Sequence, residues 1–274
     1  MLSLHAVASM AQSLVYEKAD SLKVMELLSV APEGKGMNEY MIFFGNALQG
    51  TPYVAKTLEV GNKENLIINL RELDCTTFTE NVLSLSLCAN NNKKTFLDFA
   101  NYIRLIRYQN GHIAYPTRLH YFTSWIEENE KNGFVKEVSA NMAPFSAIQT
   151  LNINFMSQHS ELYPALVRDT TLTSIIRETE NTLTGRKYRY IPKSQLTNYK
   201  LLRKYIHSGD IIAILTKKSG LDTSHIGIAS WHKDGTLHLL NASQIHKKVV
   251  DEPMTLFTYM QKHPSQIGIR CIGF

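Results

Sequence analysis

The sequence predicts an α+β fold, with helices in the first part of the chain and an antiparallel sheet in the last part. Up to about residue 206 the apolar residues recur mainly at helical spacing, and from about residue 209 they alternate with a period of two. Asp234-Gly235 separates two of the alternating stretches, and this pair is typical of a hairpin turn. Helices followed by hairpin-connected strands indicate an α+β architecture.

Helices are expected over residues 12–49, and Pro32 and the glycines that follow it divide this stretch in two. The segment Gly50–Tyr53 predicts a turn. A further helix is expected from Cys75 to about residue 90, because its apolar residues share one face.

Residues 95–205 are expected to form a helical insertion, with loops near Pro164 and Pro192. No internal repeat, low-complexity tract or Gly/Ser linker divides the chain. Residues 12–274 are therefore predicted to form a single domain.

Four strands are expected after the insertion. They are Ile211–Leu215, Ser224–Trp231, Leu237–Ala242 and Ile267–Ile272.

The composition excludes several classes of protein. With 44% hydrophobic and 19% charged residues, the chain is typical of a folded globular protein. The net charge is +5 without a basic stripe, so no nucleic-acid partner is expected. No apolar run reaches the roughly 18 residues that a transmembrane helix needs.

The three cysteines, Cys75, Cys88 and Cys271, are too few and too widely spaced for a disulfide framework or a C-x-x-C zinc site. One working and two buried cysteines are expected, unless Cys88 and Cys271 pair. Residues 1–11, MLSLHAVASMA, lack a positively charged start. They are interpreted either as the remnant of a signal peptide or as the beginning of the first helix.

Cys75 is a candidate nucleophile. Asp74 is suited to cap the helix that follows, because its carboxylate can accept a hydrogen bond from the N–H of Thr76 or Thr77. Cys75 then falls in the first turn, where free N–H groups stabilise a thiolate and can donate to an oxyanion. Asp74 itself raises the pKa of the thiol, so activation should need a cationic neighbour. A buried, inert cysteine at a helix start is the alternative.

His225 is a candidate general base. Strand alternation places it on one face with Gly227 and Ala229, which leaves room for the Cys75 helix to approach. A third group must orient the imidazole, and the next strand offers His238 and Asn241 on opposite faces. Parity does not choose between them, and a structural histidine is the alternative. A zinc site at the nearby histidines is disfavoured, because no suitably spaced carboxylate or cysteine completes it.

Several fragments together resemble the NlpC-type cell-wall cysteine hydrolases. The fragments 69–78 (NLRELDCTTF) and 118–122 (RLHYF) look more closely like the N-acetylmuramoyl-L-alanine amidase-like branch of that superfamily. The W-G-G that usually follows the tyrosine equivalent to Tyr53 is absent, and residues 95–205 are extra. The fragments that carry the wider resemblance are GTPYV (50–54), DCTTF (74–78), GD (209–210), SHIGI (224–228) and LLNAS (239–243).

The resemblance implies a papain-like core and assigns roles to individual residues. Cys75 matches the nucleophile, His225 the general base, and Asn241 the third polar residue that orients it. Tyr53 and Asp74 match positions that contact the amine end of the stem peptide in relatives.

Arg118 is expected to bind an acidic stem-peptide carboxylate; a surface ion pair is its alternative role. The resemblance implies hydrolysis of a peptidoglycan amide bond, preferably between N-acetylmuramic acid and L-Ala, without a cofactor or a metal. The alternatives are a D-Glu/diamino-acid endopeptidase and a catalytically dead module that binds cell-wall peptide. The implied substrate places the protein in the periplasm or cell envelope.

Overall fold

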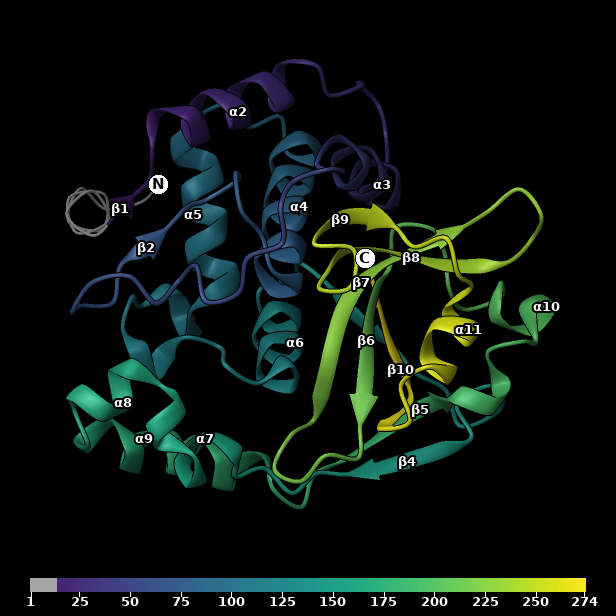
Figure 1. Cartoon of the computed structure of the whole chain (residues 1–274). Coiled ribbons are helices and arrows are strands. Elements are labelled where there is room, and N and C mark those ends of the chain that lie inside the picture. Colours follow the sequence, from purple (N-terminus) through teal and green to yellow (C-terminus); the bar gives the residue numbers. More distant parts are fainter. Residues whose placement is uncertain (1–13) are drawn as a thin grey trace.

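Two layers of helices enclose a mainly antiparallel sheet in the computed structural model, which describes residues 14–274 (Figure 1). On one side of the sheet lie α2 to α6, and on the other lie α10 and α11. The segment 1–11, interpreted above as a signal-peptide remnant or a first helix, lies outside the described residues. The helices are α2 (Lys18–Ser29), α3 (Met37–Ala47), α4 (Cys75–Asn90), α5 (Phe96–Arg107), α6 (Phe122–Lys131), α7 (Phe155–Gln158), α8 (Pro164–Arg168), α9 (Thr171–Leu183), α10 (Tyr199–Leu202) and α11 (Leu256–Gln261).

The main sheet has the strand order β4-β5-β10-β6-β7-β8-β9, and β3 pairs with the C-terminal end of β10. A separate pair, β1 with β2, is parallel. The strands at the centre of the sheet agree with the four expected from alternation, and the turn at Asp234-Gly235 joins β7 to β8. The strands are β1 (Leu14–Val15), β2 (Leu66–Ile67), β3 (Lys136–Val138), β4 (Ala147–Thr150), β5 (Lys187–Pro192), β6 (Ile211–Thr216), β7 (Thr223–Trp231), β8 (Leu237–Ser243), β9 (Lys248–Asp251) and β10 (Gln266–Gly273).

The insertion at 95–205 is not purely helical, and this part of the prediction is wrong. Within it, β3 and β5 pair with β10, and β4 pairs with β5. These strands are short, and their exposed charged residues weaken the alternating pattern on which the prediction depended. Strands β3 and β5 form because β10, more than seventy residues away, offers them a strand edge, and β4 then pairs with β5; no local pattern records these pairings.

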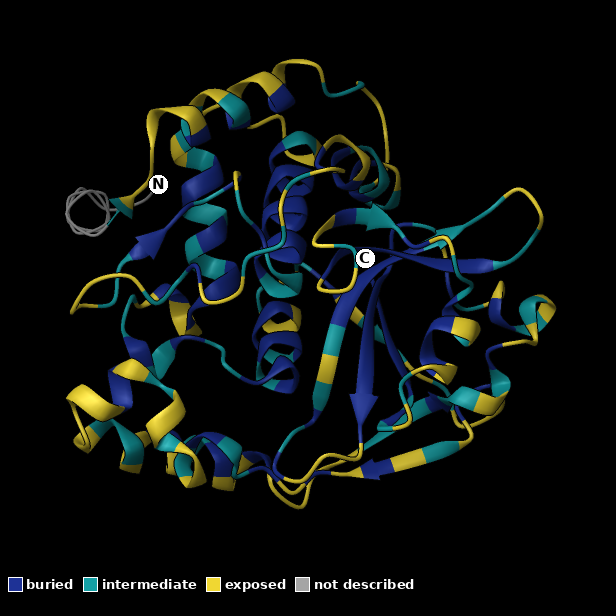
Figure 2. Ribbon diagram, in the orientation of Figure 1, coloured by how far each residue is buried: buried dark blue, intermediate teal, exposed yellow. Residues whose placement is uncertain are grey.

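The hydrophobic core fills both faces of the central strand β6, whose six residues are all buried (Figure 2). Ile211 and Ala213 pack toward α2–α6, whereas Ile212 and Ile214 pack toward α10 and α11. A strand covered on both faces is expected to be a continuous apolar run, as IIAIL is.

Helix α4 is fixed at its start and along its length. Thr77 N–H donates to Asp74 Oδ1 at 2.8 Å, which confirms Asp74 as the N-cap and Cys75 as the first helical residue. Further along, Glu80 Oε2 accepts from Arg107 Nε on α5 at 2.7 Å, and both side chains are buried. Because this ion pair lies in the core beneath the first turns, it holds the helix that presents Cys75.

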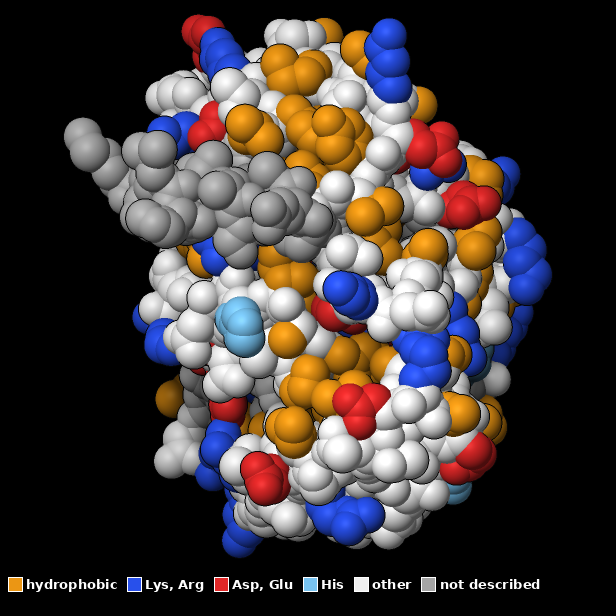
Figure 3. Space-filling view, turned by 90° about the vertical axis from the view of Figure 1, so that its left-hand side faces the viewer, with side chains coloured by type: hydrophobic (Ala, Val, Ile, Leu, Met, Phe, Trp, Pro, Cys, Tyr) orange, Lys and Arg blue, Asp and Glu red, His pale blue; other side chains and the backbone are white. Residues whose placement is uncertain are grey.

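The outer face of α2 is unusually apolar. Leu22 and Met25 on α2, and Val30 just after its last residue, are 59%, 42% and 60% exposed, and hydrophobic side chains gather at the top of Figure 3, where α2 lies.

Within residues 14–274, no helix is both long and apolar enough to span a bilayer.

Candidate active site

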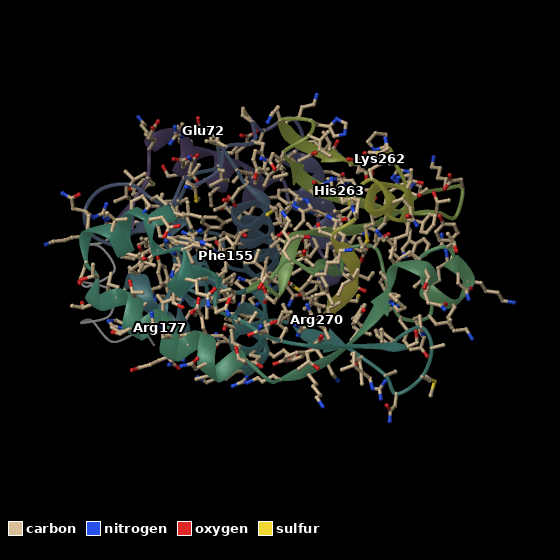
Figure 4. All side chains as sticks on the ribbon, turned by 60° about the horizontal axis from the view of Figure 1, so that its bottom comes forward. Glu72, Phe155, Arg177, Lys262, His263 and Arg270 are labelled. Carbon is tan, nitrogen blue, oxygen red and sulfur yellow. The ribbon has the colours of Figure 1, made fainter. Side chains whose placement is uncertain are left out.

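Cys75 and His225 line the same pocket, a cavity of about 210 Å³ between the start of α4, strand β7 and the segment 119–122. Helices α7 and α9 flank this region on one side, and the turn after α11 lies on the other. Figure 4 labels Phe155 of α7 and Arg177 of α9, and Lys262 and His263 of the turn after α11. The structure thus brings together two residues that lie 150 positions apart in the sequence.

The thiol of Cys75 is neutral at rest. Burial, followed by the negative charge of Asp74, raises the pKa of Cys75 to about 12. The backbone N–H of Ile226 donates to the sulfur and acts in the opposite direction, but more weakly. The direction of the Asp74 contribution is the one expected from its charge. The thiol therefore depends on a base to remove its proton.

The orientation of Asn241 determines the tautomer of His225. Asn241 Nδ2 donates to the carbonyl oxygen of Leu239 at 3.0 Å, so Oδ1 is the atom that faces the imidazole. His225 Nε2 lies 2.9 Å from Oδ1 and must carry the hydrogen, because an amide oxygen only accepts. This leaves Nδ1 of His225 unprotonated and available as a base.

His238, the other candidate for the third group, lies elsewhere. Its Nδ1 contacts the backbone oxygen of Glu252 at 2.8 Å, and its ring stacks on His232 with centroids 3.6 Å apart. The choice that parity left open is thus made by packing, and Asn241 is the residue in contact with His225. Among residues 14–274 no group of three or more His, Cys, Asp or Glu side chains is arranged to hold a metal ion.

Gly227 makes room for Asn241. A Cβ atom at Gly227 would lie 2.9 Å from Asn241 Cβ and 2.8 Å from Leu239 Cγ, closer than real Cβ atoms approach. Strands β7 and β8 pair regularly only from Ile228 onward, so Gly227 sits where the ladder opens beside His225.

Gly227→Ala should therefore displace Asn241 and lower kcat/KM by about 10- to 100-fold, with about 1–3 kcal/mol lost from the free energy of unfolding. Steady-state kinetics and urea unfolding measure the two effects. Gly36→Ala is the matched control, because a Cβ there meets nothing within 4 Å. Full activity of Gly227→Ala would contradict this account of how Asn241 is placed.

Tyr53 and Asp74 lie beside Cys75 but do not line its pocket. Burial raises the pKa of Tyr53 to about 12, with smaller contributions from the neighbouring Cys75 and Asp74. Tyr259 of α11, which the sequence analysis did not single out, also lies near Cys75, and its ring centroid is 6.2 Å from that of His225.

Arg118 does not line the pocket of Cys75 but borders the larger cavity beside it, and its role as a binder of substrate carboxylate stays a prediction. Its side chain is only 8% exposed and pairs with Glu59 and Glu64. The ion pair expected as its alternative role is therefore present, but it is buried and not on the surface. Its partners could not be read from the sequence, because both glutamates lie more than fifty residues away.

A family model described as "AmiA-like: N-acetylmuramoyl-L-alanine amidase-like" matches residues 43–269. The chain belongs to this family. The match spans α3 to β10 and includes the Cys75, His225 and Asn241 positions. No curated protein matches this member of the AmiA-like family.

Solved structures similar to this AmiA-like chain include an N-acetylmuramoyl-L-alanine amidase from Bacteroides uniformis ATCC 8492. It is 36% identical, with a TM-score of 0.81, and the alignment covers 86% of this chain and 98% of that one. A putative xylanase from Bacteroides fragilis is 40% identical, with a TM-score of 0.78 and coverage of 84% and 98%. A protein from Legionella pneumophila str. Philadelphia 1 shares the fold at 22% identity, with a TM-score of 0.69 and coverage of 97% and 96%.

Sequence reasoning missed some residues of the pocket wall. His120 and Asp222 line the pocket with Cys75. His120 stands inside the RLHYF fragment that carried the resemblance, which was a usable signal. Asp222 Oδ2 accepts a hydrogen bond from the backbone N–H of Thr123 at 2.7 Å and thereby fixes the start of α6. The two residues lie about a hundred positions apart, so no local sequence pattern predicts this contact.

Proposed function

We propose that the protein hydrolyses the amide bond between N-acetylmuramic acid and L-Ala in peptidoglycan fragments, by a Cys-His-Asn mechanism. The observation that carries this proposal is the pocket that holds Cys75 beside His225, with Nδ1 of His225 left basic by the contact with Asn241. Membership of the AmiA-like family supports the same substrate class. We further propose that the core is of the papain-like, NlpC type.

Each residue has a defined part in the reaction. Nδ1 of His225 takes the thiol proton as the Cys75 sulfur attacks the carbonyl carbon, and the backbone N–H of Cys75 donates to the oxyanion. The C–N bond then breaks, and His225 returns the proton to the departing amine of L-Ala. Water attacks the thioester, gives one proton to His225, and releases the acid and the thiol.

The charge of the pocket favours this bond over the one between D-Glu and the diamino acid. None of its lining residues is Lys or Arg, and its one carboxylate, Asp222, is already bonded to backbone N–H groups. The muramoyl side of the preferred bond is an uncharged sugar, whereas carboxylates flank the bond from D-Glu to the diamino acid. A pocket without a cation suits the uncharged group.

The name of the Bacteroides fragilis relative raises glycoside hydrolysis as another chemistry for this site. Glycosidases generally need two carboxyl groups on either side of the bond that breaks. Asp222 is the only carboxylate among the described residues of this pocket, and it is buried. The proposal therefore remains an amidase.

Mass spectrometry of defined muropeptides tests the proposal. Incubation should release an intact stem peptide that begins with L-Ala, together with the free muramoyl sugar. Release of L-Ala-D-Glu would identify the endopeptidase instead. Binding of the muropeptides without cleavage would identify a cell-wall peptide-binding module.

We also propose that the protein acts in the periplasm or cell envelope, because peptidoglycan is found there.

The pH dependence should follow His225. Burial lowers the pKa of His225 below the ordinary 6.5, and His263 lowers it further. The hydrogen bond to Asn241 and the charges of Asp74 and Glu252 raise the pKa, but by less. Because the base must be neutral, kcat/KM should rise with pH to a plateau and reach half of that plateau below pH 6.5. No second rise is expected near pH 8.5, since the pKa of Cys75 is raised to about 12. A kcat/KM profile with a midpoint above pH 7 would contradict this assignment.

A further inference from the structure

The segment that faces Cys75 across the pocket also lines a second, larger cavity. Leu119, His120 and Tyr121 border both the pocket of about 210 Å³ and a cavity of about 560 Å³ next to α6 and α9. The smaller pocket alone has less room than drug-sized ligands usually occupy. A substrate that reaches Cys75 and extends into the larger cavity must pass His120.

The imidazole of His120 is held in one orientation. Its Nε2 lies 2.8 Å from the carbonyl oxygen of Tyr115, which can only accept, so Nε2 carries the hydrogen. The ring also packs against that of Tyr115, with centroids 4.6 Å apart. In the neutral ring Nδ1 is then a bare acceptor, and no residue of 14–274 forms a hydrogen bond with it.

The neutral form of His120 is the stable one. Burial, and then the positive charge of Arg118, lower its pKa to about 3. The groups around it are Arg118, which is paired with Glu59 and Glu64, and the aromatic rings of Tyr115 and Tyr121. His120 therefore presents a lone pair, and not a positive charge, at every pH at which the protein is expected to work.

We propose that His120 is a specificity-determining residue, whose Nδ1 accepts a hydrogen bond from a neutral hydroxyl or amide N–H on the muramoyl half of the substrate. This inference rests on the proposed function. A carboxylate in the same place would direct its own lone pairs at Nδ1, and two acceptors form no hydrogen bond, which disfavours the peptide half of the bond there. An acceptor in the wall of the pocket thereby selects for a donor, because a bound substrate that lacks one covers Nδ1 without giving it a hydrogen bond.

Two variants separate this role from a structural one. His120→Gln places an amide near the position of Nε2 and keeps the bond to Tyr115, but has no acceptor at the δ position. His120→Asn keeps an acceptor at the δ position and loses the bond to Tyr115. With N-acetylmuramoyl-L-alanyl-D-isoglutamine as substrate, His120→Gln should lower kcat/KM by about 10- to 100-fold, mainly through KM, and His120→Asn by less than about fivefold. The rate of Cys75 alkylation by iodoacetamide should stay the same in both.

A series of substrates completes the test. In each, one sugar hydroxyl or the acetamido N–H is methylated. With the wild type, methylation at one position should lower kcat/KM by about 10- to 100-fold relative to the unmethylated substrate. With His120→Gln the same methylation should change kcat/KM little, because the variant already lacks that hydrogen bond. A larger loss in His120→Asn than in His120→Gln, or no loss in either, would overturn the role of His120 while leaving the amidase proposal intact. No turnover by the wild type would overturn the proposed function, and this inference with it.

Discussion

Replacing Cys75 with alanine should abolish turnover of muropeptides, with a loss of about 10⁴-fold or more in kcat/KM. The sulfur lies at the N-terminus of α4 and lines the same pocket as the imidazole of His225. Cys75→Ala removes one partly exposed atom at the first turn of α4, and the Asp74 cap is retained, so the protein should remain folded. Stem-peptide release followed by mass spectrometry measures the effect.

Cys88→Ala is the matched control for this experiment. Cys88 lies on the same helix but is fully buried in the core. Its replacement should lower the free energy of unfolding by about 1–2 kcal/mol and leave kcat/KM unchanged. Equal cleavage by the wild type and by Cys75→Ala would rule out the thiol mechanism.

Replacing His225 with glutamine should lower kcat/KM by about 10²- to 10⁴-fold, the usual contribution of a general acid–base. The amide of glutamine can still donate to Asn241 Oδ1, so the substitution removes the basic Nδ1 while it keeps the hydrogen bond that the structure shows. The same change should slow alkylation of Cys75 by iodoacetamide at pH 6, because the neutral thiol then has no base. In the wild type, Cys75 should react faster than Cys88 or Cys271, both of which are buried.

Asn241→Ala serves as the graded comparison for His225→Gln. It leaves the base in place and removes only the group that orients it, so a smaller loss of about 10- to 100-fold is expected. If Asn241→Ala were as damaging as His225→Gln, orientation would account for the whole effect. Unchanged alkylation of Cys75 in His225→Gln would show that another group removes the thiol proton.

Local patterns in the sequence were sufficient to predict the elements that depend on residues close to one another in the chain. The N-cap at Asp74, the hairpin at Asp234-Gly235 and the buried strand β6 each depend on residues within a few positions of one another. The same holds for the two helices on either side of the break after Pro32. Cys75 was also identified as a candidate, because the residues next to it indicate a helix start. His225 was identified from the small residues on its face of the strand, but that space admits Asn241, and α4 packs on the opposite face with Ile226 and Ile228.

Only the tertiary structure decided the contacts that join distant parts of the chain. Strands β3 and β5 exist because β10 pairs with them, and Arg118 is held in a buried ion pair by Glu59 and Glu64. No short-range pattern records either pairing, since the free energy of each comes from partners far away in sequence.

The candidate site divides in the same way. The sequence supplied the residue types that this chemistry needs, at Cys75, His225 and Asn241. The fold selected Asn241 over His238, fixed the tautomer of His225 through the amide of Asn241, and brought His120 to the pocket wall. A hydrogen bond depends on distance and direction between two atoms, and both are set only when the strands and helices that carry those atoms have packed.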